Sequence, residues 1–144
     1  MMRQRLLVSA CLLGTYCRYD GSARVNSAVL ALAEHYEIVP VCPEQLGGLA
    51  TPRDPSERLG ERVVTDKGLD VTDPYRRGAE ETLRLARLLG CSAAVLKEHS
   101  PSCGHDEIYD GTFSHRVVPG DGVTAELLRK NGIRVVGESG LELL

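Results

Sequence analysis

Three of the five cysteines in this chain follow, directly or after a short polar loop, an apolar run with the composition of a β-strand. The pairs are residues 6–10 with Cys11, residues 37–41 with Cys42, and residues 93–97 with Cys103. If these runs are parallel strands of one sheet, their carboxyl ends meet at the edge where open α/β sheets bind ligands. Three thiols far apart in sequence would then lie together, which indicates a metal or cluster site rather than a disulfide framework.

The rest of the chain alternates between runs that predict strands and periodic segments that predict helices. Helices are expected at residues 26–35, 74–89 and 122–130, a hairpin turn in IYDGTF around Asp110–Gly111, and a last strand at residues 134–136. Asp73 or Thr72 is the expected N-cap of the second helix, Pro74 its first residue, and Gly90 lies past its end. The alternation predicts one compact three-layer α/β domain, residues 1–144, around a mostly parallel sheet.

A polar stretch rich in proline, glycine and charge separates the second predicted strand from the long helix. It runs from Pro43 to Asp73, and only residues 62–65 have an extended pattern. A simple connection of this length is uncommon, so we expect a functional loop. Within it, Gly47–Gly48 would either let the backbone approach a ligand closely or form an ordinary turn.

Length and charge limit the classes of partner. With 144 residues, the chain has the length of one domain. Its net charge of -3 and pI near 5.8 provide no basic field for duplex or long RNA, which favours a small-molecule substrate. The apolar run near the N-terminus is interrupted too early for a signal sequence or membrane span. We interpret it as a first strand and expect free thiols in a reducing compartment, the cytoplasm.

The spacing of the cysteines favours one kind of metal chemistry. They do not form the C-x-x-C pairs of structural zinc ribbons, nor the compact run typical of ferredoxins. Thiolates from separate loops suit an enclosed site with one open coordination position. A [4Fe–4S] cluster held by three cysteines leaves one iron free to act on substrate as a Lewis acid. This pattern predicts a catalyst rather than an electron carrier.

Five motifs resemble the thiouracil desulfidase (TudS) family, in the same order and over residues 7–136. They are CLLGTYCRYDG, VCPEQLGGLATPRDPSE, LKEHSPSCG, IYDGTF and GVTAELLRKNGI. The resemblance implies a Rossmann-like α/β domain and an oxygen-sensitive [4Fe–4S] cluster. It also implies that 2- or 4-thiouracil, or the corresponding nucleoside, is converted to uracil without net redox change. The substrate sulfur would bind the free iron, water would replace it at carbon, and sulfide would be released.

Carried over motif by motif, the resemblance implies that Cys11, Cys42 and Cys103 are the cluster ligands. Cys17 belongs to the same motif as Cys11 and is a competing ligand. Cys91 lies among small and apolar residues, where cysteine usually behaves as a small hydrophobic side chain. We therefore exclude only Cys91 from the expected site.

Glu44 and Ser100 are the expected catalytic residues. Glu44 lies two residues after Cys42, where a carboxylate can move protons to or from water or a substrate nitrogen, and the resemblance implies that role. Ser100 is assigned by the same resemblance, as a hydroxyl that donates to the substrate sulfur or to cluster sulfide. Ser102 could do the same, and either serine could instead only hold the loop through local backbone bonds.

Other polar residues in the motifs are weaker candidates. Lys97 or Arg53 could offset the negative charge of a cluster on three thiolates, and an arginine can also grip a carbonyl or phosphate group. Arg18 and Asp20 could pair with each other or face the substrate. The four histidines have no ligand-like spacing, and we treat His99 and His105 as neighbours of the Cys103 loop.

Three other functions stay open at this point. A structural zinc module would use four cysteines as a closed ligand set, namely Cys11, Cys17, Cys42 and Cys103. A metal-free thiol enzyme would need a base beside a reactive thiol. A cluster enzyme could also handle sulfur on thiolated tRNA, although the modest charge disfavours binding of a whole tRNA.

Overall fold

The computed structural model describes residues 3–144, and its centre is a parallel sheet. The four strands lie in the order β2-β1-β5-β8, and every neighbouring pair is parallel. Their bounds are β1 (Arg5–Ser9), β2 (Glu37–Val41), β5 (Ala93–Leu96) and β8 (Arg134–Gly137). Each predicted strand is therefore found, and β1 lies inside the sheet between β2 and β5.

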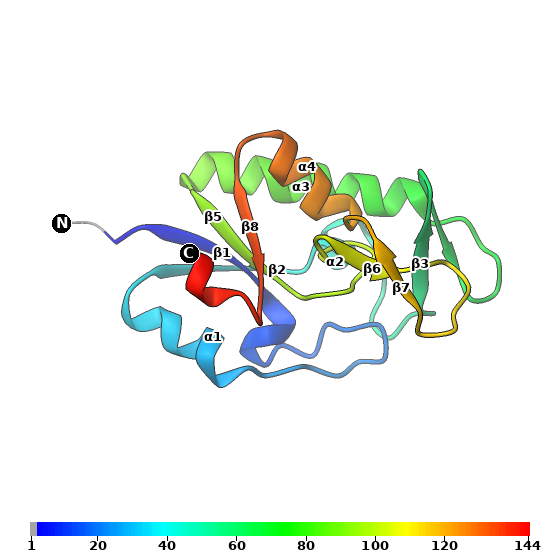
Figure 1. Cartoon of the computed structure of the whole chain (residues 1–144), viewed down its shortest axis with the longest axis horizontal. Coiled ribbons are helices and arrows are strands. Elements are labelled where there is room, and N and C mark those ends of the chain that lie inside the picture. Colours follow the sequence, from blue (N-terminus) through cyan, green and yellow to red (C-terminus); the bar gives the residue numbers. More distant parts are fainter. Residues whose placement is uncertain (1–2) are drawn as a thin grey trace.

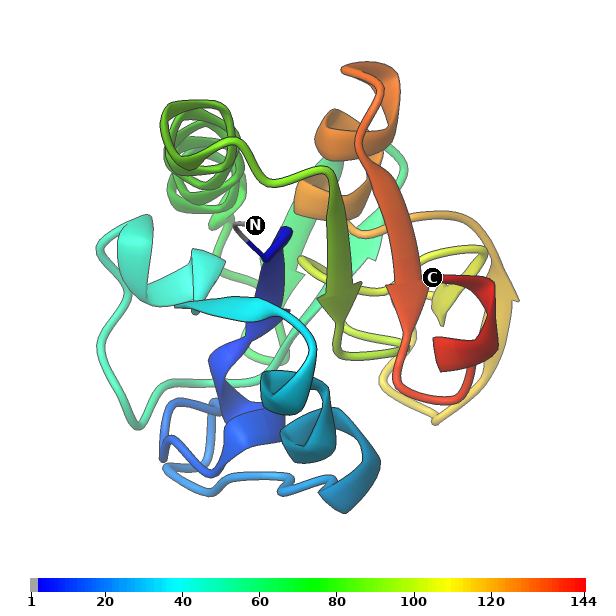
Figure 2. The same cartoon turned by 90° about the vertical axis from the view of Figure 1, so that its left-hand side faces the viewer.

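Helices cover both faces of this sheet (Figures 1 and 2). On one face α3 (Thr72–Leu89) and α4 (Val123–Lys130) pack against Leu7 and Ala94. On the other face α1 (Ser27–Ala31) packs against Leu6, Val8 and Val95, beside 3-10 turns at Ala10–Leu13, Leu32–Glu34 and Leu141–Leu143. Successive strand side chains point to opposite faces, so a strand covered on both sides is apolar throughout. The three-layer α/β fold is confirmed.

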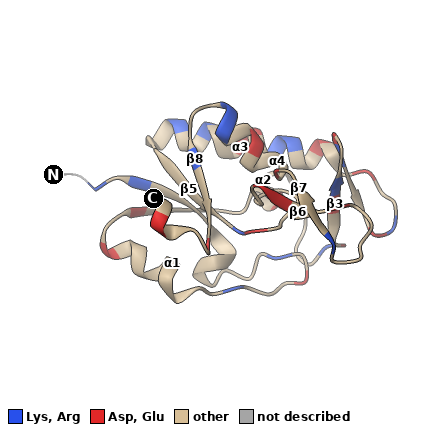
Figure 3. Ribbon diagram, in the orientation of Figure 1, with Lys and Arg blue, Asp and Glu red and all other residues tan. Residues whose placement is uncertain are grey.

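The long helix α3 differs from its prediction at its start. It begins at Thr72 after the N-cap residue Val71, two positions earlier than expected, and ends at Leu89, as expected, before the C-cap residue Gly90, whose φ is 67°. The Thr72 hydroxyl accepts a hydrogen bond from the Val63 N–H at 2.9 Å, so it holds strand β4 instead of capping the helix. Basic and acidic residues both occur along this helix (Figure 3). Across residues 3–144 we find no helix with the length and apolar character to span a membrane.

The polar stretch 43–73 is more regular than the expected loop. It contains α2 (Pro43–Leu46) and an antiparallel hairpin of β3 (Ser56–Leu59) and β4 (Arg62–Thr65). Only β4 was expected, because β3 has the polar sequence SERL. Its Glu57 is nevertheless buried, since the carboxylate accepts hydrogen bonds from the backbone of a distant loop.

A second hairpin closes the same end of the molecule. Strands β6 (Glu107–Tyr109) and β7 (Val117–Pro119) pair antiparallel. The expected turn at Asp110–Gly111 lies at the start of a longer loop, residues 110–116, and so is not a two-residue turn. Gly122 is the N-cap of α4, as its position at the start of the predicted helix indicates.

Glycines bring α2 against α3. A Cβ on Gly47 would lie 2.0 Å from the Pro74 carbonyl oxygen, and one on Gly78 would lie 1.9 Å from the Pro43 carbonyl oxygen. The close approach that Gly47 permits is therefore to a helix and not to a ligand. This contact sets where α2, and with it Glu44, stands relative to α3.

Gly78→Ala is expected to lower the free energy of unfolding by about 1–3 kcal/mol, because the added methyl forces the two backbones apart. Chemical denaturation would measure the change, with Glu80→Ala at an exposed position of the same helix as control. A stability for Gly78→Ala equal to that of Glu80→Ala would contradict the tight contact.

Candidate active site

A pocket of about 550 Å³ lies at the carboxyl ends of β1, β2 and β5. Ser9 at the end of β1 lies opposite Val41 at the end of β2, so the chain leaves both strands side by side. Cys11 follows in a 3-10 turn, Cys42 is the N-cap of α2, and Cys103 lies in the loop after β5. These three cysteines, Cys17, Glu44 and Ser100 all line this one pocket.

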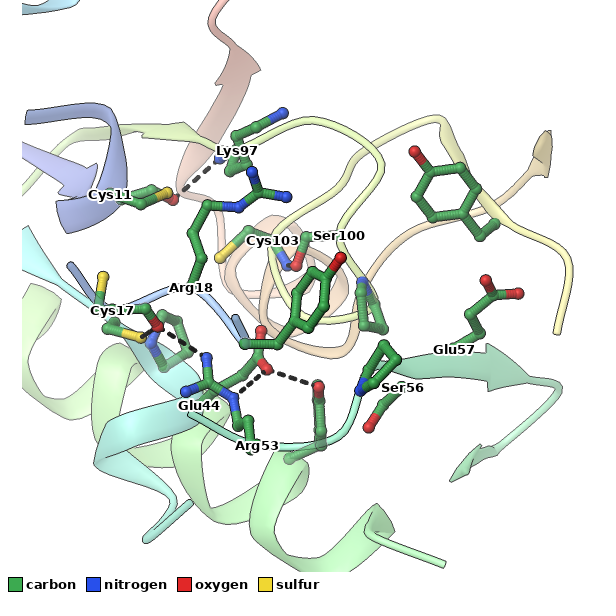
Figure 4. Close-up of a pocket in the computed structure, with 18 of the residues that line it drawn as sticks. Cys11, Cys17, Arg18, Glu44, Arg53, Ser56, Glu57, Lys97, Ser100 and Cys103 are labelled. Atoms are coloured by element: carbon green, nitrogen blue, oxygen red, sulfur yellow. Dashed lines mark hydrogen bonds and ion pairs between the residues drawn. The ribbon is translucent and has the colours of Figure 1, made fainter. Parts of the chain in front are cut away.

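The sulfur atoms of Cys11, Cys17 and Cys103 are directed into the same region of the pocket (Figure 4). Cys42 joins them, with its Sγ 3.8 Å from the Cys17 carbonyl oxygen. All of these thiols are free, and Cys42 is the one that is only half-buried. Cys91 is packed in the apolar core against other side chains and does not line the pocket.

Three of the pocket thiols, Cys17, Cys42 and Cys103, have raised pKa values and are protonated at neutral pH in the absence of a metal. Contact with the Cys11 thiol raises the pKa of Cys17 to about 11. Contact with Cys17, together with burial, raises the pKa of Cys42, and burial raises that of Cys103 to about 12. A nucleophilic cysteine needs a lowered pKa, so a metal-free thiol enzyme is disfavoured. A metal that binds here must displace protons.

The spacing of the ligands distinguishes two kinds of metal site. Within residues 3–144, no three His, Cys, Asp or Glu side chains are close enough together to hold a single metal ion. One zinc ion bound at about 2.3 Å would need four sulfurs gathered around one point. In a polynuclear cluster each thiolate binds a different iron, so the ligands lie further apart. The arrangement therefore suits a cluster better than one zinc ion.

Glu44 is held through one of its two carboxylate oxygens. Its Oε1 accepts hydrogen bonds from the Tyr75 hydroxyl at 2.7 Å and from Arg53 Nε at 3.0 Å. Oε2 accepts none from residues 3–144, and it is not a buried unpaired atom, so it stays accessible. Burial raises the pKa of Tyr75, which keeps its hydroxyl a donor. The second oxygen is therefore the one available for proton transfer.

Arg53 holds Glu44 in position through a hydrogen-bonded ion pair. Besides Nε, its Nη1 donates to the Ala50 carbonyl oxygen and Thr51 Oγ1, and its Nη2 donates to the Cys17 carbonyl oxygen at 2.8 Å. Burial opposes the charge, but the Glu44 carboxylate outweighs it and raises the pKa of Arg53. These bonds use all but one of the N–H donors of Arg53, so it has no pair of donors left with which to grip a substrate.

The two serines before Cys103 have different roles. Ser102 is fully buried, and its hydroxyl shares a 2.9 Å hydrogen bond with Thr124 Oγ1. Ser100 lines the pocket, and its Oγ accepts hydrogen bonds from the N–H groups of Ser102 and Cys103. Both of these bonds use the oxygen as acceptor, so the Ser100 hydroxyl hydrogen can still be donated into the pocket.

Comparison with known proteins identifies the family. The sequence model of the 2-thiouracil desulfurase family matches residues 6–140. The chain belongs to this family. The resemblance inferred from the motifs is thereby confirmed.

Two relatives extend the comparison. A solved structure titled [4Fe-4S]-dependent thiouracil desulfidase TudS superposes with a TM-score of 0.93 at 47% identity, covering 99% of this chain and 95% of that one. The uncharacterized protein YbbK of Bacillus subtilis (strain 168) is 44% identical over 94% of this chain and 97% of its own length. The Rossmann-like α/β fold is thus shared with TudS over nearly the whole chain.

Sequence reasoning missed the aromatic lining of this pocket. The chain has five tyrosines and one phenylalanine, and four of these six line it: Tyr19, Tyr75, Tyr109 and Phe113. Glu57 positions part of this lining, because its Oε1 accepts hydrogen bonds from the backbone N–H groups of Gly111 and Phe113 at 2.9 and 3.0 Å. Three of the four aromatic residues stand in or beside the polar motifs, a concentration that could have indicated them.

The other polar residues considered from the sequence differ in their contacts and in whether they line the pocket. Lys97 is paired with Glu138 at 2.8 Å. Asp20 accepts hydrogen bonds from Ser22, and no ion pair joins it to Arg18 in residues 3–144. His99 and His105 do not line the pocket, whereas His115 does.

Proposed function

We propose that this chain is a thiouracil desulfidase that holds a [4Fe–4S] cluster on Cys11, Cys42 and Cys103. Family membership and the cluster dependence of the solved relative support the assignment. The observation that carries it is one pocket lined by these three thiols together with Glu44 and Ser100. When bound, the cluster supplies an iron that acts on the substrate sulfur as a Lewis acid.

The residues of the chain then divide the remaining work. Glu44 Oε2 takes a proton from water or gives one to a ring nitrogen, since Tyr75 and Arg53 hold the other oxygen still. Ser100 donates its hydroxyl hydrogen to the sulfur end of the substrate. The aromatic residues of the pocket face the flat pyrimidine ring and exclude water from it. Such a site converts thiouracil to uracil and sulfide without net redox change.

Anaerobically purified or reconstituted protein tests this proposal. We expect about four irons and four acid-labile sulfides per chain, and equal amounts of uracil and sulfide from 2- or 4-thiouracil. Removing iron with a chelator should abolish turnover, and this would exclude a thiol enzyme. Stoichiometric zinc without desulfuration would overturn the proposal in favour of a structural metal module. Activity on thiolated tRNA but on neither free base would assign the cluster to the tRNA reaction.

A further inference from the structure

Arg18 lines the pocket, and its side chain forms no hydrogen bond or ion pair with residues 3–144. It lies directly after Cys17, and its backbone is fixed by a hydrogen bond from its N–H to the Ser22 carbonyl oxygen at 3.1 Å. Its side chain extends between Cys11 and Ser100 in the view of Figure 4, with the guanidinium carbon 5.8 Å from the centre of the Tyr19 ring. The group is therefore held in place at the site.

The Nη1 atom of Arg18 is buried and has no hydrogen-bond partner. In the part of the chain that the structure describes, residues 3–144, it is the one buried side-chain nitrogen or oxygen in this condition. A buried unpaired donor costs free energy, and more so when it is charged, so such atoms are rare in native proteins. The missing acceptor is best supplied by a molecule that enters the pocket.

The nearby carboxylates Glu44 and Asp20 form no ion pair with Arg18 within residues 3–144 and accept hydrogen bonds from other groups. Glu44 accepts from Tyr75 and Arg53, and Asp20 accepts from Ser22. Two other cations that line the pocket are paired, Arg53 with Glu44 and Lys97 with Glu138, and Arg24 is exposed. Of Arg18, Arg53 and Lys97, Arg18 is the one whose side chain forms no hydrogen bond or ion pair with residues 3–144.

The proposed substrate has an acceptor that neither the metal nor Ser100 serves. Its sulfur goes to the metal and to Ser100, whereas the carbonyl oxygen at its other substituted carbon would be buried unpaired. A guanidinium donates to such an oxygen in the plane of the ring. We propose that Arg18 binds the carbonyl oxygen that the thiopyrimidine retains, and so selects oxo-thiopyrimidines over thiopyrimidines that lack the oxygen. This inference rests on the proposed function.

Arg18→Met tests the inference because methionine keeps length and removes every donor. Each thiouracil is compared with the pyrimidinethione that lacks its oxygen, using cluster-loaded protein. We expect kcat/KM for the thiouracil to fall about 10- to 100-fold, and kcat/KM for the pyrimidinethione to change little. Arg76→Met, at an exposed position of α3, is the matched control and should preserve the preference of the wild type.

A second measurement needs no turnover. Calorimetry compares binding of uracil with binding of the pyrimidinone that has only one oxygen, and Arg18→Met should weaken the first selectively. Equal losses of affinity for both ligands would overturn the inference. A changed reduction potential of the cluster, with the substrate preference unchanged, would also overturn it and would assign Arg18 to the cofactor. A wild-type protein that releases sulfide from no thione would instead overturn the proposed function and this inference with it.

Discussion

Cys103→Ala is expected to remove both the bound iron and the thiouracil turnover, and Cys11→Ala and Cys42→Ala should do the same. Each proposed ligand comes from a different strand end, so no neighbouring thiol of the same segment replaces Cys42 or Cys103. A cluster left with two thiolates loses one of its anchored irons and decomposes. Iron and sulfide content after anaerobic reconstitution, with the absorption spectrum, measures the effect.

Two other cysteines serve as controls for this series. Cys91→Ala removes a thiol from the apolar core and should leave iron content unchanged. Cys17→Ala removes a thiol that lies within the pocket, beside Cys11 and Cys42, and should also retain a full cluster. Loss of iron in Cys17→Ala, with a full cluster in Cys11→Ala, would exchange these two residues in the ligand set.

Glu44→Gln is expected to keep the cluster and to lower kcat by about 10²- to 10⁴-fold, the usual contribution of a general acid or base. The amide oxygen of glutamine can still accept from Tyr75 and Arg53, so the pocket should keep its shape while proton transfer is lost. Product formation with iron content measured on the same sample separates these effects.

Tyr75→Phe is the matched partner of this variant. It removes one hydrogen bond to Oε1 and leaves the carboxylate, so kcat should fall by only about tenfold. Unchanged turnover in Glu44→Gln would eliminate the proposed acid–base role, and a loss of iron would show that Glu44 supports the cluster instead.

Much of the fold was predictable because its signals are local. Apolar runs at residues 6–10, 37–41 and 93–97 indicate buried parallel strands, and the Gly90 stop of α3 follows from its left-handed backbone. Strand β3 was missed for the opposite reason. Its Glu57 is buried only because the backbone of residues 111 and 113, more than fifty positions away, donates to it.

The sequence by itself determined that Cys11, Cys42 and Cys103 reach one site, because topology alone carries the ends of parallel strands to one edge. Only the tertiary structure decided their partners. Glu44 bonds to Arg53 nine positions away and to Tyr75 thirty-one positions away, and Arg18 Nη1 is left buried without a hydrogen-bond partner among residues 3–144. Such choices depend on how loops pack against each other, and no periodicity within one segment encodes them.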